Sequence, residues 1–128
     1  MRSSARAEWQ GAMAKVVMVL AQGPGLPEGS LDERIELRAC LTPQGRIDLD
    51  AWKADPEPWR ATRRGAGGVE RVGELVWCDD RWTWRGPDGD DGPVWALDIA
   101  VVRPGDIVTL RRDRGAPSLF RIVAVEQD

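Results

Sequence analysis

Short apolar runs separated by clusters of Gly, Pro and Asp are the feature that most restricts how this chain can fold. The sequence holds 14 glycines and 9 prolines among 128 residues, and these residues interrupt every window in which a helical apolar stripe could develop. Within the runs, apolar and polar residues alternate with the period of two that is typical of strands. We therefore expect an all-β fold, either a mainly antiparallel small barrel or a compact β-sandwich.

The pattern indicates one β domain over residues 15–128, preceded by a flexible leader over residues 1–14. A chain of this length can bury a core without the help of a disulfide or a metal. Ser30 could cap a short helical turn, but the alternation through residues 35–39 favours a strand there. The expected strands cover residues 15–21, 33–41, 45–52, 59–64, 70–78, 81–85, 94–102, 106–112 and 118–126.

The segment 75–84 carries the clearest local prediction, a β-hairpin. If the Asp-Asp pair at 79–80 forms a two-residue turn, Trp77 lies opposite Trp82. A longer loop would shift this register. Because cross-strand partners share a face, the hairpin would present one aromatic surface. The residues on that surface are Leu75, Trp77, Trp82 and Trp84.

The end of the chain predicts a three-strand meander. Pro104 presets a negative φ and Gly105 accepts a positive one, which together are the signature of a type II turn. This turn joins the predicted strands over residues 94–102 and 106–112, and the chain then returns through residues 118–126. We therefore expect a C-terminal three-strand meander as part of the barrel or sandwich.

The absence of two residue types excludes much catalytic chemistry. The chain contains no His and no Tyr, so His acid/base catalysis, His metal ligation and a Ser-His-Asp triad are excluded within it. Cys40 and Cys78 lack a metal-ligand spacing, although they could form one disulfide. The acidic segment 86–93 has the first two Asp of a calcium loop, but Ile99 stands where a bidentate Glu is needed. We therefore predict neither a metal nor a cofactor.

The charge balance bears on partners and location. The net charge of −3 does not favour nucleic acid, because non-specific binding to phosphates needs a positive field. No apolar run approaches the roughly 20 residues of a membrane span. We expect no membrane contact and a cytoplasmic location, with a protein partner or self-association ranked first and single-stranded nucleic acid ranked last.

The tryptophans supply the candidate ligand site. Seven Trp accompany a single Phe, and although most are expected in the core, exposed indoles can stack on sugar rings or bases. Two Trp beside prolines are the candidates for exposure. Two nearby Asp could form an acid/base pair or a solvated strand face, and an Arg cluster could contact phosphate or carboxylate. The candidate ligand-binding residues are Trp52, Trp59, Asp48, Asp50, Arg63 and Arg64; no catalytic residue is predicted.

The closing segment also resembles a known family. The Pro-Gly-Asp turn and apolar run of residues 103–110, followed by the apolar run of residues 119–126, are similar to the last hairpin of small phage head–tail joining proteins. Those proteins are β-rich connector subunits that assemble into a ring and carry out no chemistry. The resemblance covers this closing segment alone, and it implies a structural role.

The sequence has clear strand and turn patterns but no recognisable set of catalytic residues. It therefore favours a non-catalytic small β-barrel that acts as a binding or assembly module through its surface. Sheet edges and exposed Trp would supply the contact surface. The alternative is a ligand-binding or enzymatic β-barrel for a small or sugar-like molecule, and a second alternative is a phage-connector-like structural protein. A ligand titration followed by Trp fluorescence separates the first two, because only the ligand-binding barrel predicts a response.

Overall fold

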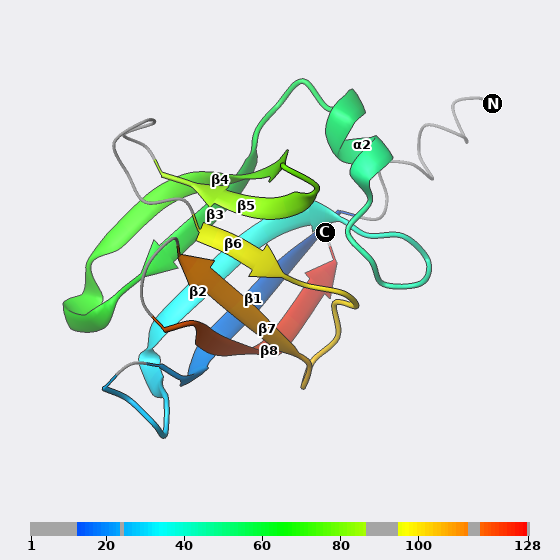
Figure 1. The fold of residues 1–128 in the computed structure, drawn as a ribbon. Helices are drawn as coiled ribbons and strands as arrows, with labels where there is room; N and C mark the ends of the chain where they lie inside the picture. The colour runs from blue at the N-terminus through cyan, green and yellow to red at the C-terminus, as the bar shows by residue number, and fades with distance from the viewer. Residues whose placement is uncertain (1–12, 24, 87–94, 113–115, 128) are drawn as a thin grey trace.

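Eight strands close into one antiparallel barrel (Figure 1). The computed structural model describes residues 13–23, 25–86, 95–112 and 116–127. Each strand pairs with the next along the chain and the last pairs with the first, so the expected all-β antiparallel fold is confirmed in its barrel form. The strands are β1 Met13–Gln22, β2 Ser30–Cys40, β3 Trp59–Arg64, β4 Glu70–Cys78, β5 Arg81–Arg85, β6 Trp95–Asp98, β7 Ile107–Arg112 and β8 Ser118–Gln127.

Two short helical elements interrupt the strands of the described chain. The helix α2 spans Leu49–Ala54 between β2 and β3, and the 3₁₀ turn η1 spans Ala66–Gly68 between β3 and β4. In Figure 1, α2 stands beside the end of the barrel where β1 begins and β8 ends. Neither element is long and apolar enough to cross a membrane.

The pairing of β1 with β8 closes the barrel. Both strands are 10 residues long, and their register shifts between Val17 and Met18 and again between Leu20 and Gln22. Bulges of this kind add the twist and coil that a sheet needs to close on itself. Because every described strand has a neighbour on both sides, the described barrel offers no open edge for pairing with another chain.

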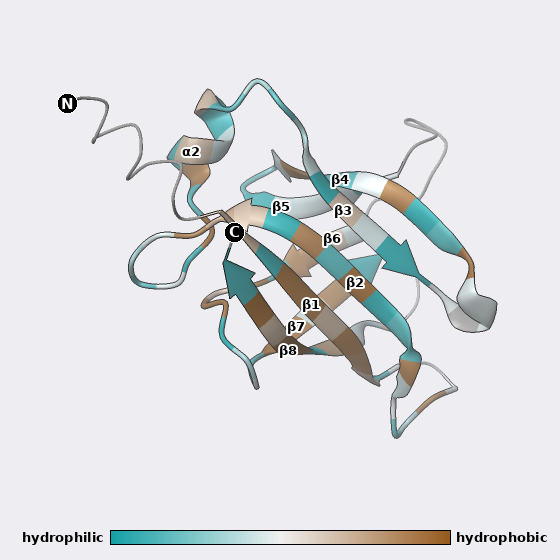
Figure 2. Cartoon of the chain, turned by 180° about the vertical axis from the view of Figure 1, so that it is seen from behind, coloured by the Kyte–Doolittle hydropathy of each residue, from teal (hydrophilic) through white to brown (hydrophobic). Residues whose placement is uncertain are grey.

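The barrel interior is divided between aliphatic and aromatic side chains. The strands β1, β2, β7 and β8 direct aliphatic residues and Phe120 inward, whereas β3, β5 and β6 contribute large indoles. Figure 2 shows apolar residues alternating with polar ones along the strands. Eight strands make a barrel just wide enough to be filled by side chains. The largest fully buried side chains are Trp59, Met18, Ile35, Leu37, Leu75, Leu110, Ile122, Val16 and Val108.

The hairpin of β4 and β5 has the predicted register. Trp77 pairs with Trp82, as a two-residue turn requires. Asp79 and Asp80 have positive φ angles of 54° and 62°, which is the conformation of a type I′ turn, whose twist matches that of the flanking strands. The residues of the predicted aromatic face all lie in the core or pack against it: Leu75, Trp77, Trp82 and Trp84.

The predicted strand over residues 45–52 is wrong, because α2 occupies much of this segment. Asp48 is the N-cap of the helix, and its carboxylate accepts the backbone N–H of Ala51 at 3.0 Å. The Trp52 indole N–H donates to the carbonyl of Leu75 at 3.0 Å. A cap and a long-range hydrogen bond therefore stabilise a helix where the apolar alternation predicts a strand.

The C-terminal meander is confirmed, although its first strand is shorter than predicted. β6, β7 and β8 pair antiparallel in order. The predicted strand covers residues 94–102, whereas β6 spans only Trp95–Asp98. After Asp98 the chain continues to the Pro-Gly turn. Gly105 has a φ of 97°, and the Asp106 N–H donates to the Arg103 carbonyl at 3.1 Å, as a type II turn requires.

Two predictions fall largely outside the described residues. Residues 1–12 of the predicted leader are not described, and the last two residues of that segment belong to β1. Most of the acidic segment 86–93 is likewise outside the described chain. Ser30, where a helical turn was the alternative, begins the strand β2, and its hydroxyl accepts the Asp32 N–H at 3.1 Å.

Candidate functional site

The six described tryptophans form two groups by their ring contacts. One group, which we call the four-indole cluster, consists of Trp52, Trp59, Trp77 and Trp82 and lies at the end beside α2. The ring centroid of Trp82 is 6.2 Å from that of Trp59, with the planes 18° apart, and it meets Trp52 and Trp77 edge to face at 5.9 Å and 5.1 Å. Pairs in these arrangements are favourable beyond their area of burial. The cluster is therefore a closely packed aromatic wall.

Hydrogen bonds from α2 and the residue after it hold two of these indoles. Trp52 lies on α2 and is bonded to the carbonyl of Leu75, as described above. The Trp59 indole N–H donates to the carboxylate of Asp55 at 2.9 Å, and Asp55 directly follows the helix. Because a buried indole N–H needs a partner, the helix positions both rings. Trp52 and Trp77 are the partly exposed members of the cluster, whereas Trp59 and Trp82 are buried.

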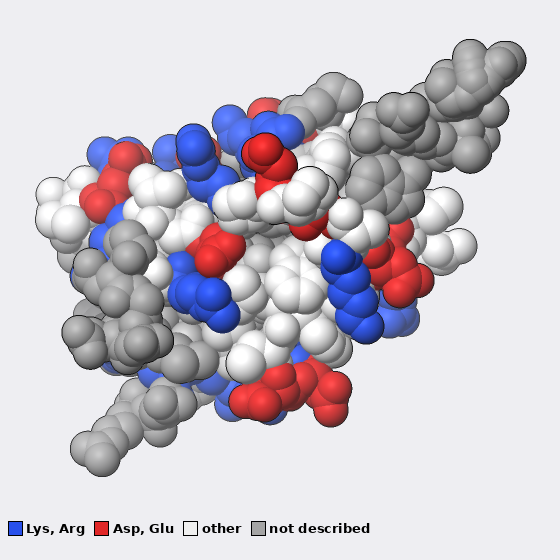
Figure 3. All heavy atoms as spheres, turned by 90° about the horizontal axis from the view of Figure 1, so that it is seen from above, with Lys and Arg blue, Asp and Glu red and all other residues white. Residues whose placement is uncertain are grey.

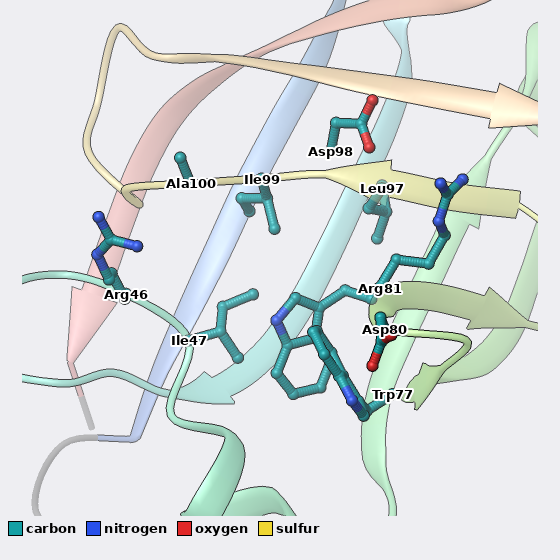
Figure 4. Close-up of a pocket in the computed structure, with 10 residues that line it drawn as sticks. Arg46, Ile47, Trp77, Asp80, Arg81, Leu97, Asp98, Ile99 and Ala100 are labelled. Atoms are coloured by element: carbon teal, nitrogen blue, oxygen red, sulfur yellow. The ribbon is translucent and has the colours of Figure 1, made fainter.

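A cavity of about 290 Å³ opens beside Trp77 and Trp82 (Figure 4). In Figure 4, Ile47 and Ile99 extend into the cavity from linkers outside the strands, and Arg46 lies at one side. A volume of this size is at the lower limit of small-molecule sites, about 300 Å³. The cavity therefore suits a small ligand with an apolar face.

Charged groups of both signs border this cavity. Arg46 and Arg81 bring guanidinium groups, and Asp80 and Asp98 bring carboxylates. Asp98 is already engaged, because Nε of Arg111 lies 2.6 Å from its Oδ2. On the face shown in Figure 3, acidic and basic side chains are likewise interspersed around uncharged surface. The rim of the cavity can thus offer both donors and acceptors to a polar ligand.

The second aromatic group lies at the barrel end away from α2 and combines two indoles with two arginines. The guanidinium carbon of Arg63 is 3.8 Å from the ring centroid of Trp95 and 4.9 Å from that of Trp84, and that of Arg112 is 4.6 Å from Trp95. Burial, and then repulsion by Arg112 and another nearby cation, lower the pKa of Arg63 to about 10. A cation is therefore held at this end in a partly dehydrated place.

The structure separates the predicted site residues. Trp52 and Trp59 come together in the four-indole cluster, but Trp59 is only 2% exposed, and neither is among the residues that line the cavity beside Trp77. Asp48 caps α2 and Asp50 is exposed in its first turn. The two Asp therefore do not form a carboxylate pair on one strand face.

The two predicted arginines lie at the far end of the barrel from these four residues. Arg63 is half-buried and lies over the rings of Trp84 and Trp95, whereas its neighbour Arg64 is exposed at the end of β3. Adjacent residues of a strand point to opposite faces, so the two guanidinium groups do not form one contact surface.

A second cavity, of about 370 Å³, lies between α2 and the barrel and contacts Met13 and Cys40. Burial, followed by the charges of Asp48 and Asp55, raises the pKa of the Cys40 thiol. Cys78 is exposed on the surface, and no disulfide joins the two cysteines. The cavity beside Trp77, which two indoles and charged residues of both signs line, is the better candidate.

Sequence reasoning missed most of the residues around that better candidate. The hairpin pattern places Trp77 and Trp82 on one face beside the turn, so Asp80 could have been inferred next to them. Ile47 and Ile99 carry no such signal, because they come from two linkers that meet only when the barrel closes.

These features define a class: a closed eight-stranded antiparallel β-barrel with a small, aromatic-walled cavity at one end. Within the described residues, no group of three or more Cys, Asp or Glu side chains is placed to hold a metal ion. Comparison with known protein families, with curated proteins and with solved structures finds no match.

Proposed function

We propose that this protein is a non-catalytic binding module that takes a small polar ligand with one flat apolar face, such as a single sugar ring, in the cavity beside Trp77. The observation that carries the proposal is the edge-to-face contact of Trp77 with Trp82 at 5.1 Å, in which both rings line a cavity of about 290 Å³. Aromatic walls with a few polar groups at fixed positions are typical of small-molecule sites.

The charged rim supports the choice of ligand. A sugar ring has an apolar face of C–H groups that suits an indole and hydroxyls that both donate and accept hydrogen bonds. Arg46 and Arg81 supply donors, and Asp80 supplies an acceptor. A purely apolar ligand would leave these groups without partners, which is unfavourable when they are desolvated.

The sequence analysis expects sheet edges and exposed Trp to form the contact surface for assembly. Two features of the barrel argue against such a surface. The described sheet is closed and has no edge strand to extend. Four of the six described indoles are buried and two are partly buried, so none is broadly exposed for contact with a partner. A protein partner stays a prediction, but the ligand cavity has the stronger physical basis.

The proposal is tested by titrating monosaccharides while following the indole N–H signals by NMR. The signals of Trp77 and Trp82, assigned with Trp77→Phe and Trp82→Phe, should move and saturate. Arg81→Gln should weaken binding by about tenfold or more if its guanidinium donates to the ligand. Arg121→Gln, which removes the same charge from an exposed position on β8, is the matched control. The proposal fails if no sugar or other small polyhydroxy compound moves the two signals.

Self-association is a second candidate function, because several large apolar side chains are exposed. Leu31, Val69 and Val72 are 81%, 66% and 50% exposed, and exposed apolar surface can mark contacts between proteins. Sedimentation at high protein concentration tests this candidate: a discrete oligomer that Val72→Lys dissociates would support it, and a strict monomer would remove it.

A further inference from the structure

The end of the barrel away from α2 holds a half-buried positive charge, that of Arg63, which makes no ion pair within the described residues. Arg63 lies on the inner face of β3, over the rings of Trp84 and Trp95. Indole faces attract a guanidinium, but they do not replace a counter-charge. Glu33 acts on Arg63 only through its charge, and the ion pairs among the described residues include none between the two.

A second guanidinium, that of Arg112 on β7, also contacts the ring of Trp95. Arg112, at the end of β7, pairs with Trp95 across β6 and β7, and its guanidinium carbon is 4.6 Å from the ring centroid. Like charges repel more strongly where water is partly excluded. The repulsion between Arg63 and Arg112 contributes to the lowered pKa of Arg63.

The indole between these arginines has a polar atom without a partner. Trp95 is 8% exposed, and its Nε1 is buried and makes no hydrogen bond within the described residues. By contrast, the neighbouring Trp84 indole N–H donates to the carbonyl of Ala61 at 2.8 Å. A buried donor without a partner costs free energy and indicates a missing acceptor.

We propose that this end of the barrel binds a small oxyanion, a phosphate or a carboxylate, at the ring edge of Trp95. The N–H lies at the edge of the ring, and both guanidinium groups lie close to the ring centroid, at 3.8 Å and 4.6 Å, so an oxyanion that accepts from the N–H would lie near both. Arg63 and Arg112 would supply charge-assisted donors, which bind phosphate and carboxylate with matching geometry. One ligand thereby satisfies the orphan donor and brings negative charge close to both cations.

This site is independent of the sugar cavity. The oxyanion would bind among the ends of β3 and β7 and the start of β6 (Figure 1), whereas Trp77 is the second-last residue of β4, beside the β4–β5 turn. The two sites can therefore be tested separately in the same protein, because each has its own indole N–H signal.

The test is a titration of the full chain with sodium phosphate at constant ionic strength, with sodium chloride as the reference salt. The N–H signal of Trp95, assigned with Trp95→Phe, should move and saturate at millimolar phosphate, and the Trp77 signal should not move. Sodium acetate replaces phosphate in a second arm and shows whether a carboxylate is also accepted. Arg112→Gln should weaken phosphate binding by about tenfold or more, because it removes a charged donor.

Arg111→Gln is the matched control, since it removes the same charge from the next residue of β7, whose side chain pairs with Asp98 instead. It should leave the phosphate affinity within about twofold of the parent, because exposed charges act weakly at a distance in salt. Arg63→Lys keeps the charge but loses the planar fork, and it should also weaken binding. Intact signals from the four-indole cluster verify the fold of each variant.

Two outcomes would overturn the proposal. The first is a Trp95 signal that responds equally to chloride and phosphate, or to neither. The second is an equal loss of affinity in Arg111→Gln and Arg112→Gln, which would indicate non-specific charge attraction.

Discussion

The indole of Trp84 lies directly on Gly73, the residue two positions before its cross-strand partner Leu75 in β4. A Cβ built on Gly73 would come within 2.9 Å of the ring carbons of Trp84 and even closer to the carbonyl oxygen of Arg85. The same ring then reaches across β4 to donate to the carbonyl of Ala61 on β3. The missing side chain at Gly73 is therefore what allows the large ring to lie flat inside the barrel.

This relationship predicts that Gly73→Ala destabilises the protein. The added methyl group meets backbone and ring atoms that cannot both move away, and overpacking of this kind costs about 1–3 kcal/mol. Chemical denaturation followed by Trp fluorescence measures the loss. Gly65→Ala is the control, because a Cβ at Gly65 meets nothing within 4 Å and the residue has a negative φ of −93°. Equal stabilities of the two variants would contradict the packing argument.

The cap of α2 gives a second prediction. Asp48→Ala removes the carboxylate that accepts the Ala51 N–H at 3.0 Å, and loss of such a cap costs about 1 kcal/mol. Asp50→Ala, on an exposed residue in the first turn, should cost less, about 0.3–1 kcal/mol, because it removes only a favourable charge near the helix dipole. Denaturation midpoints compare the two variants. A larger loss for Asp50→Ala would show that Asp48 does not act as a cap.

The turn between β4 and β5 gives a prediction in which one substitution raises stability and weakens ligand binding. Asp79 and Asp80 both have positive φ, a conformation that costs an L-residue about 1–2 kcal/mol and that Gly adopts freely. Asp80→Gly should therefore raise stability by about 1 kcal/mol while weakening the proposed sugar binding, since Asp80 borders the cavity.

Asp79→Gly separates these two effects. Asp79 has the same backbone conformation but does not line the cavity, so this variant should gain stability and keep its affinity. The measurements are thermal unfolding and the monosaccharide titration. If both variants bind as tightly as the parent, the carboxylate of Asp80 has no part in ligand binding.

The buried thiol of Cys40 predicts a dependence of stability on pH. Burial raises the pKa of this thiol above its ordinary value of 9.0, so the folded protein holds the proton more tightly than the unfolded chain. The resulting stability is fully present below pH 9.0 and is lost as pH rises toward the folded pKa, at up to about 1.4 kcal/mol per pH unit. Urea unfolding measured at pH values on both sides of 9.0 should show this slope in Cys78→Ala and not in Cys40→Ala.

Sequence patterns predicted best where the decisive contacts are close along the chain. Period-two alternation located β3, β4 and β5 to the residue, and the two-residue turn placed Trp77 against Trp82. These features depend on backbone geometry over a few residues, which the residue types themselves restrict. The same alternation was misleading at residues 45–52, because α2 depends on a hydrogen bond from Trp52 to Leu75, 23 residues away.

The sequence by itself determined that the chain forms antiparallel strands with indoles on their inner face, and that imidazole chemistry is absent. Only the tertiary structure decided that the sheet closes through β1 and β8, that Arg63 lies between two indoles, and that Ile47 and Ile99 face one cavity. The reason is the range of the forces involved. Strand and turn preferences act between near neighbours, whereas closure brings together residues whose separation along the chain carries no signal of their contact.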